Sequence, residues 1–474
     1  MLFFGLIPLF FATHRLNQKT ALYGALIVGF LYNCVVIYPL STLNTWWWTV
    51  SNGLLWQYKN LLYFGVTILL AAICSLITFG VVFLLYIKQL KKFPLVSLFV
   101  LPIAWEFLET VRVKLFFNLE WGTLGHDLGN NIFFARSVAF GGTFILSSLV
   151  VILNFCLFLF LFSVIERQKI SKREFIKKIA VATCVLIGIF VALILNNNFI
   201  LKNAATEKNT NPRGEISVVI ISPNIQTADV NETTGSEHIF TLISEAIKNS
   251  PDLILLPENI FPFLVIDEKT ELPFNYTQNK TVAKNFDKLT SISKKLPSTT
   301  FIVGFHTIKN SSASSTSRYN SAVVLEKGKI VSIYNKQNLL PFTEKSFSFL
   351  ETIHIDPLSA GSGQKTIHTA LGDIRPLICS EILTSQNSFF ENFTDSATTS
   401  PKNKVFSVNL SNDNIFNSHR VATYNKISAK LQAIELEETL VRSSKGGFSG
   451  IFDQTGQEIP LVSEKGGEIL FGKI

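Results

Sequence analysis

Four ionisable residues lie at or just beyond short apolar runs of the kind that form β-strands. Glu258 follows "DLILLP", Lys336 follows "KIVSIYN" and Cys379 follows "IRPLI". Glu344 lies in "LLPFTE", eight residues beyond Lys336. Loops converge at strand ends in layered α/β folds, and function gathers there. We therefore take these four residues as candidates for one shared site.

A cysteine, a glutamate and a lysine together suffice for acyl transfer. A thiolate attacks an acyl carbon well, but an ordinary thiol has a pKa of about 8.5 and is mostly protonated at neutral pH. A carboxylate within hydrogen-bond reach can take the thiol proton during attack and return it to the leaving group. A fixed ammonium can stabilise the oxyanion of the tetrahedral intermediate. Such a site needs no histidine.

The cysteine content leaves two readings of Cys379 open. Four of the five cysteines lie in long apolar runs (Cys34, Cys74, Cys156 and Cys184), so Cys379 is alone in the more polar half. Exported domains normally pair their cysteines as disulfides. A single thiol there is either a small buried apolar residue or a reactive nucleophile. The neighbouring Glu and Lys candidates favour the nucleophile.

Other catalytic machineries find little support in the chain. The seven histidines are scattered, without the H-x-x-x-H spacing of a zinc site. The stretch "GGFSG" misses the G-x-S-x-G register of a serine hydrolase. No glycine-rich phosphate loop occurs. We therefore expect neither a metal nor a cofactor.

The apolar residues divide the chain into two parts. Of its 474 residues, 48% are apolar and only 16% are charged, too apolar a balance for an ordinary soluble enzyme. Apolar runs with short charged breaks extend to about residue 195, and strand-like and helix-like patterns alternate beyond about residue 200. This pattern predicts a transmembrane helical domain over 1–195, a polar linker over 196–214 and a catalytic domain over 215–474.

Five apolar runs are long enough to cross a bilayer, which takes about 20 residues. They cover residues 21–40, 60–87, 93–111, 143–165 and 179–195. The opening "MLFFGLIPLFFA" is apolar but short, so it is a shortened span, a re-entrant piece or a signal-like start. We predict five to six spans.

Basic loops set the expected orientation. "THRLNQK", "KQLKK" and "ERQKISKREFIKK" follow alternate spans, whereas loops 41–58 and 115–131 lack Lys and Arg and contain tryptophans. Basic loops remain cytoplasmic. The last span therefore runs outward and places the globular part outside the cytoplasm, on the periplasmic side in a bacterium. The net charge of +8 comes largely from these loops and does not indicate nucleic-acid binding.

The globular part has the pattern of an α/β layered fold. Strand-like runs occupy 216–221, 252–257, 300–305, 321–326, 329–335, 374–379, 404–410, 448–453 and 467–472. "EKGK" and "DQTGQ" read as hairpin turns. Apolar residues recur every three or four positions in 236–249 and 421–434, which predicts two amphipathic helices.

The motifs carrying these residues resemble those of a known superfamily. "LLPEN", "YNKQNLLPFTE", "LICSE" and "VNLSNDNIF" are similar, in this order, to the motif series of the nitrilase superfamily. Their place after a multi-span membrane part resembles the apolipoprotein N-acyltransferase family. The stretch "NLEWGTLGHDL" is similar to the membrane part of that family.

The resemblance implies an αββα sandwich and a role for each candidate. Cys379 would be the nucleophile, Glu258 the general base and Lys336 the oxyanion stabiliser. Glu344 would be an accessory acid, and Glu381 a supporting residue beside the cysteine. The implied reaction moves a fatty acyl chain from a membrane phospholipid to a thioester on Cys379. The acyl chain would then pass from Cys379 to the N-terminal amine of a diacylglyceryl-cysteine apolipoprotein. The enzyme would be a monomer.

Alternatives remain open at this point. The chain could be a membrane-tethered amidase, with water as the acceptor, or a non-catalytic scaffold that kept the fold. Loops 259–274 and 337–350 carry Phe and Leu that either dip into lipid or pack within the domain. Arg442, in "LVRSS", fits a structural ion pair better than a catalyst.

Overall fold

The chain divides into two compact units, one ending at Thr210 and one beginning at Gly214 among the residues described. The computed structural model describes residues 4–42, 59–115, 120–168, 170–210, 214–224, 232–261, 265–269, 271–273, 280–312, 315–340, 344, 358–362, 366–383, 404–416 and 418–474. Each unit is described by itself.

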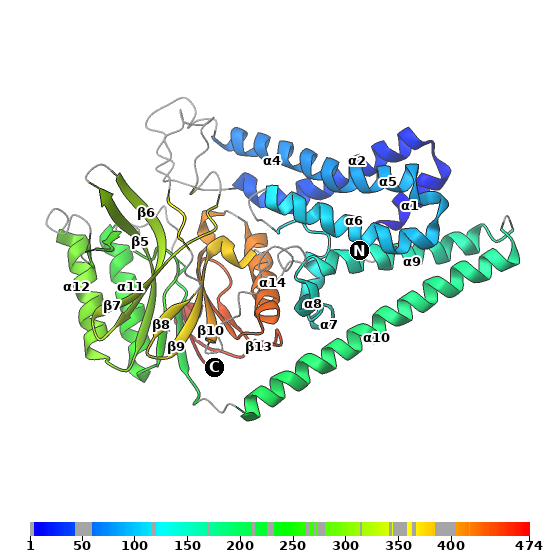
Figure 1. Cartoon of the computed structure of the whole chain (residues 1–474). Helices are drawn as coiled ribbons and strands as arrows, with labels where there is room; N and C mark the ends of the chain where they lie inside the picture. The colour runs from blue at the N-terminus through cyan, green and yellow to red at the C-terminus, as the bar shows by residue number, and fades with distance from the viewer. Residues whose placement is uncertain are drawn as a thin grey trace. The chain divides into compact units, whose positions relative to one another are not determined.

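The N-terminal unit is helical (Figure 1). Its main helices are α1 (Ile7–Arg15), α2 (Gln18–Ile37), α4 (Lys59–Ser75), α5 (Val81–Lys88), α6 (Pro94–Leu115), α9 (Ile145–Ile165) and α10 (Lys172–Thr210), with the short α7 (Ile132–Ala135) and α8 (Val138–Gly141) before α9. In the described part, five segments are long and apolar enough to cross a membrane: 18–42, 63–88, 94–115, 145–165 and 172–206. Each overlaps one predicted span. With nine residues, α1 is too short for a span.

Aromatic packing explains part of the phenylalanine content. The Phe10 ring lies 5.3 Å from that of Phe83, 5.0 Å from that of Phe155 and 5.5 Å from that of Phe158. Other large apolar side chains, such as Leu61 and Ile103, are exposed. Aqueous exposure of so much apolar surface is unfavourable, whereas a bilayer accommodates it.

Most of the segment 196–214, for which the sequence predicts a polar linker, is helical, because α10 continues to Thr210. Asn197 has partners within the unit: Arg136 Nη1 donates to its Oδ1 at 3.1 Å, and its Nδ2 donates to the Leu193 carbonyl. From residue 189 to residue 211 the sequence has no proline or glycine, and the helix ends just ahead of Pro212.

The C-terminal unit contains two mixed sheets. Within the described residues, the first has the order β14-β15-β1-β2-β5-β3-β4, with β6 paired to β5 and β7 to β6. Its strands are β1 (Ser217–Ile221), β2 (Leu253–Leu255), β3 (Val265–Asp267), β4 (Leu272–Pro273), β5 (Thr300–Ser312), β6 (Ser315–Glu326), β7 (Lys329–Asn335), β14 (Val462–Glu464) and β15 (Ile469–Lys473). Strands β1, β2 and β5 are parallel neighbours.

The second sheet has the order β13-β12-β11-β10-β9-β8. Its strands are β8 (Ile367–Thr369), β9 (Gly372–Ile378), β10 (Lys404–Asn412), β11 (Leu440–Lys445), β12 (Gly450–Phe452) and β13 (Glu458–Ile459). Strands β9, β10 and β11 run parallel. Their carboxyl ends therefore meet at one edge.

Four layers result, and the predicted αββα fold class is confirmed (Figure 1). Val218 and Leu255 of the first sheet share one apolar core with Ile374 and Val408 of the second. Helices α11 (Glu232–Ala246) and α12 (Lys280–Lys295) cover the outer face of the first sheet. Helix α14 (His419–Leu436) packs against β11 and β12. An αββα domain thus follows the N-terminal apolar helices.

All nine predicted strands and both predicted helices are present, the helices as α11 and α14. The hairpin turns join β6 to β7 and β12 to β13. Strand β11 and helix α12 were not predicted. In α12, Ala283, Phe286 and Leu289 are buried at helical spacing, a signal that the many lysines around them obscured.

The two apolar loops are only partly described. Ile260, Phe261 and Leu340 are buried, so these side chains pack within the domain and do not dip into lipid. Residues 262–264, 341–343 and 345–350 lie outside the described residues, as does most of the predicted tryptophan-bearing loop 41–58.

Candidate active site

The candidate residues gather where several strands end. Cys379 follows β9, Asp413 follows β10 and Lys445 is the last residue of β11. The parallel register pairs Ile378 with Leu410 and Asn412 with Lys445, which brings these three ends to one edge. From the first sheet, the segment after β2 brings Glu258 to the same place, since Lys445 Nζ donates to the Asn259 carbonyl at 2.8 Å.

Glu258 is buried, and one of its oxygens is available. Its Oε1 accepts a hydrogen bond from Asn320 Nδ2 at 2.6 Å. Among the described residues, Oε2 has no hydrogen-bond partner. Burial raises the pKa of Glu258 above its usual range, opposed by the positive charge of Lys336. A Cβ at Gly304 would lie 2.5 Å from the Glu258 Cα, so a glycine there lets the backbone of Glu258 approach closely.

Lys336 is 1% exposed, and its charge is matched by Glu344. Lys336 Nζ donates to Glu344 Oε2 at 2.6 Å, and the Leu340 amide donates to the same oxygen. Glu344 Oε1 accepts from Asn320 Nδ2 at 2.8 Å, so one amide group bridges the two carboxylates. Burial alone would lower the pKa of Lys336, but Glu344, Cys379 and Glu258 raise it above its usual range. The side chain therefore remains an ammonium ion.

Cys379 has an uncommon backbone conformation, with φ of +50°. A non-glycine residue in this region is strained, and such strain concentrates at functional sites. Burial, followed by the negative charge of Glu258, raises the pKa of the Cys379 thiol, and Lys336 acts against this. The resting cysteine is therefore a thiol and needs a base to become a nucleophile.

Glu381 ties the turn after β9 to the segment after β7. Its Oε2 accepts from the Ile378 amide at 2.7 Å. Its Oε1 accepts from the Gln337 and Asn338 amides and from the Tyr334 hydroxyl, at 2.7, 3.1 and 3.0 Å. Both oxygens are thus occupied by groups that hold the backbone. Holding the backbone on both sides of the site is consistent with the supporting role predicted for Glu381.

The structure therefore brings all five predicted site residues into one region and adds two that the sequence did not single out. Asn320 is a buried residue of β6 that lies among other polar residues of this strand, so no local signal in the sequence distinguishes it. Lys445 ends a strand that was not predicted, so its position at the shared edge was hidden.

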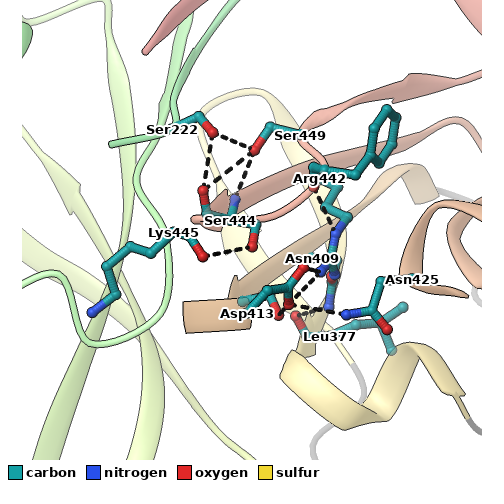
Figure 2. A network of polar contacts seen from close by, with 11 residues as sticks. Ser222, Leu377, Asn409, Asp413, Asn425, Arg442, Ser444, Lys445 and Ser449 are labelled. Carbon is teal, nitrogen blue, oxygen red and sulfur yellow. Dashed lines mark hydrogen bonds and ion pairs between the residues drawn. The ribbon is translucent and has the colours of Figure 1, made fainter. Parts of the chain in front are cut away.

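Arg442 forms the predicted ion pair, deep in the second sheet (Figure 2). It is fully buried, and its Nη2 lies 2.9 Å from each oxygen of Asp413. Arg442 also donates to Asn409 Oδ1 and to the Phe448 carbonyl. Asn425 Nδ2 donates to Asp413 from α14. This network ties β10, β11 and α14 together beside β9, the strand that precedes Cys379.

Both parts of the chain match known protein families. Residues 1–156 match the N-terminal domain of apolipoprotein N-acyltransferase, and residues 220–397 match the carbon-nitrogen hydrolase family. The apolipoprotein N-acyltransferase of Aquifex aeolicus is 24% identical over 94% of this chain and 92% of its own length. That of Wigglesworthia glossinidia brevipalpis is 24% identical over 92% and 83%.

Among solved structures, Nit3 of Saccharomyces cerevisiae, a member of branch 10 of the nitrilase superfamily, covers 55% of this chain and 89% of its own, with 15% identity and a TM-score of 0.39. The two family matches fall on the membrane part and the α/β part in the order found in the full-length relatives. Over most of its length, the chain is therefore similar to apolipoprotein N-acyltransferases.

Proposed function

We propose that the protein transfers a fatty acyl chain from a membrane phospholipid to the N-terminal amine of a diacylglyceryl-cysteine apolipoprotein. One observation carries the proposal. A cluster of buried Glu258, buried Lys336 and half-buried Cys379 lies in a chain whose other part matches the membrane domain of this acyltransferase family. Glu344 and Glu381 would be accessory residues that hold the cluster.

In the first half-reaction the Cys379 thiol adds to the carbonyl carbon of a phospholipid ester. The free Oε2 of Glu258 takes the thiol proton as the S–C bond forms. The ammonium of Lys336 stabilises the oxyanion. When the intermediate collapses, the C–O bond breaks, the lysophospholipid leaves with the proton from Glu258, and a thioester remains on Cys379.

In the second half-reaction the α-amine of the apolipoprotein attacks the thioester carbon. Glu258 takes a proton from the amine, and Lys336 again faces the oxyanion. Collapse breaks the C–S bond, forms an amide and returns the proton to the Cys379 sulfur. Use of water as the acceptor would instead make the protein an amidase or thioesterase.

The proposed location is the inner membrane of a bacterium, with the catalytic domain on the periplasmic side. The basic loops and the five apolar helices support it. We place the end of the membrane domain near Leu195, where the apolar run ends. The 39 residues of α10 extend about 58 Å at 1.5 Å per residue, more than the roughly 30 Å of a hydrocarbon core, so its last turns would leave the bilayer.

Intact-protein mass spectrometry after incubation with phospholipid vesicles tests the proposal. We expect the mass of one fatty acyl group on the wild type, removable by hydroxylamine, and none on Cys379→Ala. Adding a diacylglyceryl-cysteine peptide should clear the adduct and give an N-acylated peptide. Absence of an adduct on folded wild type would refute the proposal, and clearance by water alone would favour the amidase.

A further inference from the structure

Lys445 is a buried cation for which the proposed reaction gives no role. It ends β11 and is 4% exposed. Its Nζ donates to the carbonyl of Asn259, the residue that follows the proposed base and has a φ of +44°. In Figure 2 its side chain points away from the Arg442–Asp413 pair, toward the strands of the other sheet. Lys445 therefore spans from one sheet to the segment of the other that carries Glu258.

A buried ammonium is costly unless an opposite charge compensates it. Glu258 is the carboxylate whose charge acts on Lys445, and the effect is mutual. Burial lowers the pKa of Lys445 to about 8, although Glu258 opposes this. At neutral pH Lys445 is thus mostly charged, and its charge depends on the state of Glu258.

The charges facing Glu258 come from three elements. Lys336 and Glu344 lie beyond β7, and Lys445 lies at the end of β11. Cys379, beyond β9, is neutral as a thiol. Lys336 has the strongest electrostatic effect on Glu258, but it is also bound to Glu344 in a 2.6 Å ion pair. Lys445 acts more weakly and is a second cation that stabilises an ionised Glu258.

We propose that Lys445 is a positioning residue for the general base: it anchors the backbone beside Glu258 through the Asn259 carbonyl and keeps the Glu258 carboxylate ionised. The role in catalysis rests on the proposed function. It follows that Glu258 is ready to accept the thiol proton at neutral pH despite its burial. When Glu258 becomes protonated, Lys445 loses its compensating charge, which favours return of the proton to the leaving group.

Three substitutions separate the anchor from the charge. Lys445→Gln keeps a hydrogen-bond donor but loses the charge, Lys445→Arg keeps the charge, and Lys445→Met loses both. Lys473→Met, at an exposed lysine of β15 paired with Glu215, is the control. If Lys445→Met does not fold, Lys445→Gln carries the test.

The first measurement is independent of acyl transfer. Infrared difference spectroscopy across a pH titration follows the Glu258 carboxyl band, identified by its loss in Glu258→Gln. Loss of a nearby opposite charge raises the pKa of a carboxyl group, by about one unit or more. We expect the Glu258 midpoint to move upward by about one pH unit in Lys445→Gln and Lys445→Met, and to stay near the wild-type value in Lys445→Arg and Lys473→Met.

The second measurement is the pH dependence of thioester formation. Because acylation requires ionised Glu258, its acidic limb should move to higher pH by the same amount in Lys445→Gln. A uniform loss of rate with an unmoved limb and an unmoved infrared midpoint would show a purely structural lysine and overturn the proposal. If the infrared midpoint moves in Lys445→Gln but the wild type forms no thioester, the proposed function is refuted while the control of Glu258 by Lys445 stands.

Discussion

Two buried charge clusters of the C-terminal unit differ in how completely their hydrogen bonds are satisfied. In the first, Asp413 accepts from Arg442 with both oxygens, and its Oδ1 also accepts from Ser411 and Asn425. In the second, Glu258 has one oxygen bonded to Asn320 and one without a partner among the described residues. Both clusters are buried, so burial alone does not distinguish them.

The difference indicates what each cluster is for. A carboxylate whose oxygens are all occupied can hold strands together, but it has no lone pair directed at an incoming proton. A carboxylate with a vacant buried oxygen carries an unfavourable desolvation energy, which the fold tolerates where a substrate or thiol proton will fill the vacancy. Glu258 should therefore matter to rate, and the Arg442 cluster to stability.

The largest expected effect is that of Glu258→Gln on thioester formation. Glutamine has nearly the same shape but cannot accept the thiol proton, so the rate should fall by up to about 10⁴-fold. Burial raises the pKa of Glu258, so the folded state holds the proton more tightly than the unfolded chain does. The folded state therefore loses stability as the pH rises from the pKa of Glu258 in the unfolded chain through that in the folded state. Glu258→Gln removes this cost but also removes the charge opposite Lys445, so the free energy of unfolding at neutral pH should change little.

Single-turnover acylation followed by mass spectrometry, with urea unfolding in parallel, measures both quantities. Glu245→Gln, at a partly exposed glutamate on α11 that pairs with the exposed Lys248, is a control expected to change neither. Substantial acylation by Glu258→Gln would remove Glu258 from the role of base.

The second-largest expected effect is a loss of stability in Arg442→Met. Arg442→Met leaves Asp413 buried without its cation, and breaking a buried pair from one side costs about 3–5 kcal/mol. Denaturant unfolding should show this loss, while the acylation rate per folded molecule stays within a few-fold of wild type. The double variant Arg442→Met/Asp413→Asn, which removes both charges, should recover part of the stability. A stable Arg442→Met that fails to acylate would contradict the assignment of this cluster to structure.

The comparison also shows what the sequence predicts and what it leaves hidden. Glu258, Lys336 and Cys379 were found because each follows an apolar run that forms a strand, β2, β7 or β9. Strand periodicity and strand ends are local properties, so a sequence shows them directly. The αββα layers follow from the same runs together with the resemblance.

Partnerships between distant segments were not predictable in the same way. Lys445 and Asn259 are separated by 186 residues, and nothing near either one indicates that they meet. The polar sequence at 196–210 suggested a linker, but contacts between Asn197 and Arg136 support a helix there. In both cases the local structure depends on hydrogen bonds between distant segments more than on local composition.

The smallest of the three expected effects is that of Lys336→Met. It compares Lys336, the cation near Glu258, with Arg442, the cation of the structural cluster. Lys336→Met removes the ammonium that would face the oxyanion, and losing one such group costs about 10²–10³-fold in rate. Both half-reactions form an oxyanion, so acylation and aminolysis should slow together. Stability should fall less than in Arg442→Met, because Asn320 and the Leu340 amide still donate to Glu344.

Separate single turnovers measure the two steps, first with vesicles alone and then with the diacylglyceryl peptide added to preformed thioester. Lys336→Arg restores the charge with a different shape. Partial recovery of the rate would therefore assign the effect to the charge, and absence of recovery would assign it to geometry. If Lys336→Met slowed only acylation, Lys336 would act on the phospholipid and not on an oxyanion common to both steps. If it instead lost as much stability as Arg442→Met while keeping its rate, the two clusters would be equivalent and the contrast in their hydrogen bonding would carry no functional meaning.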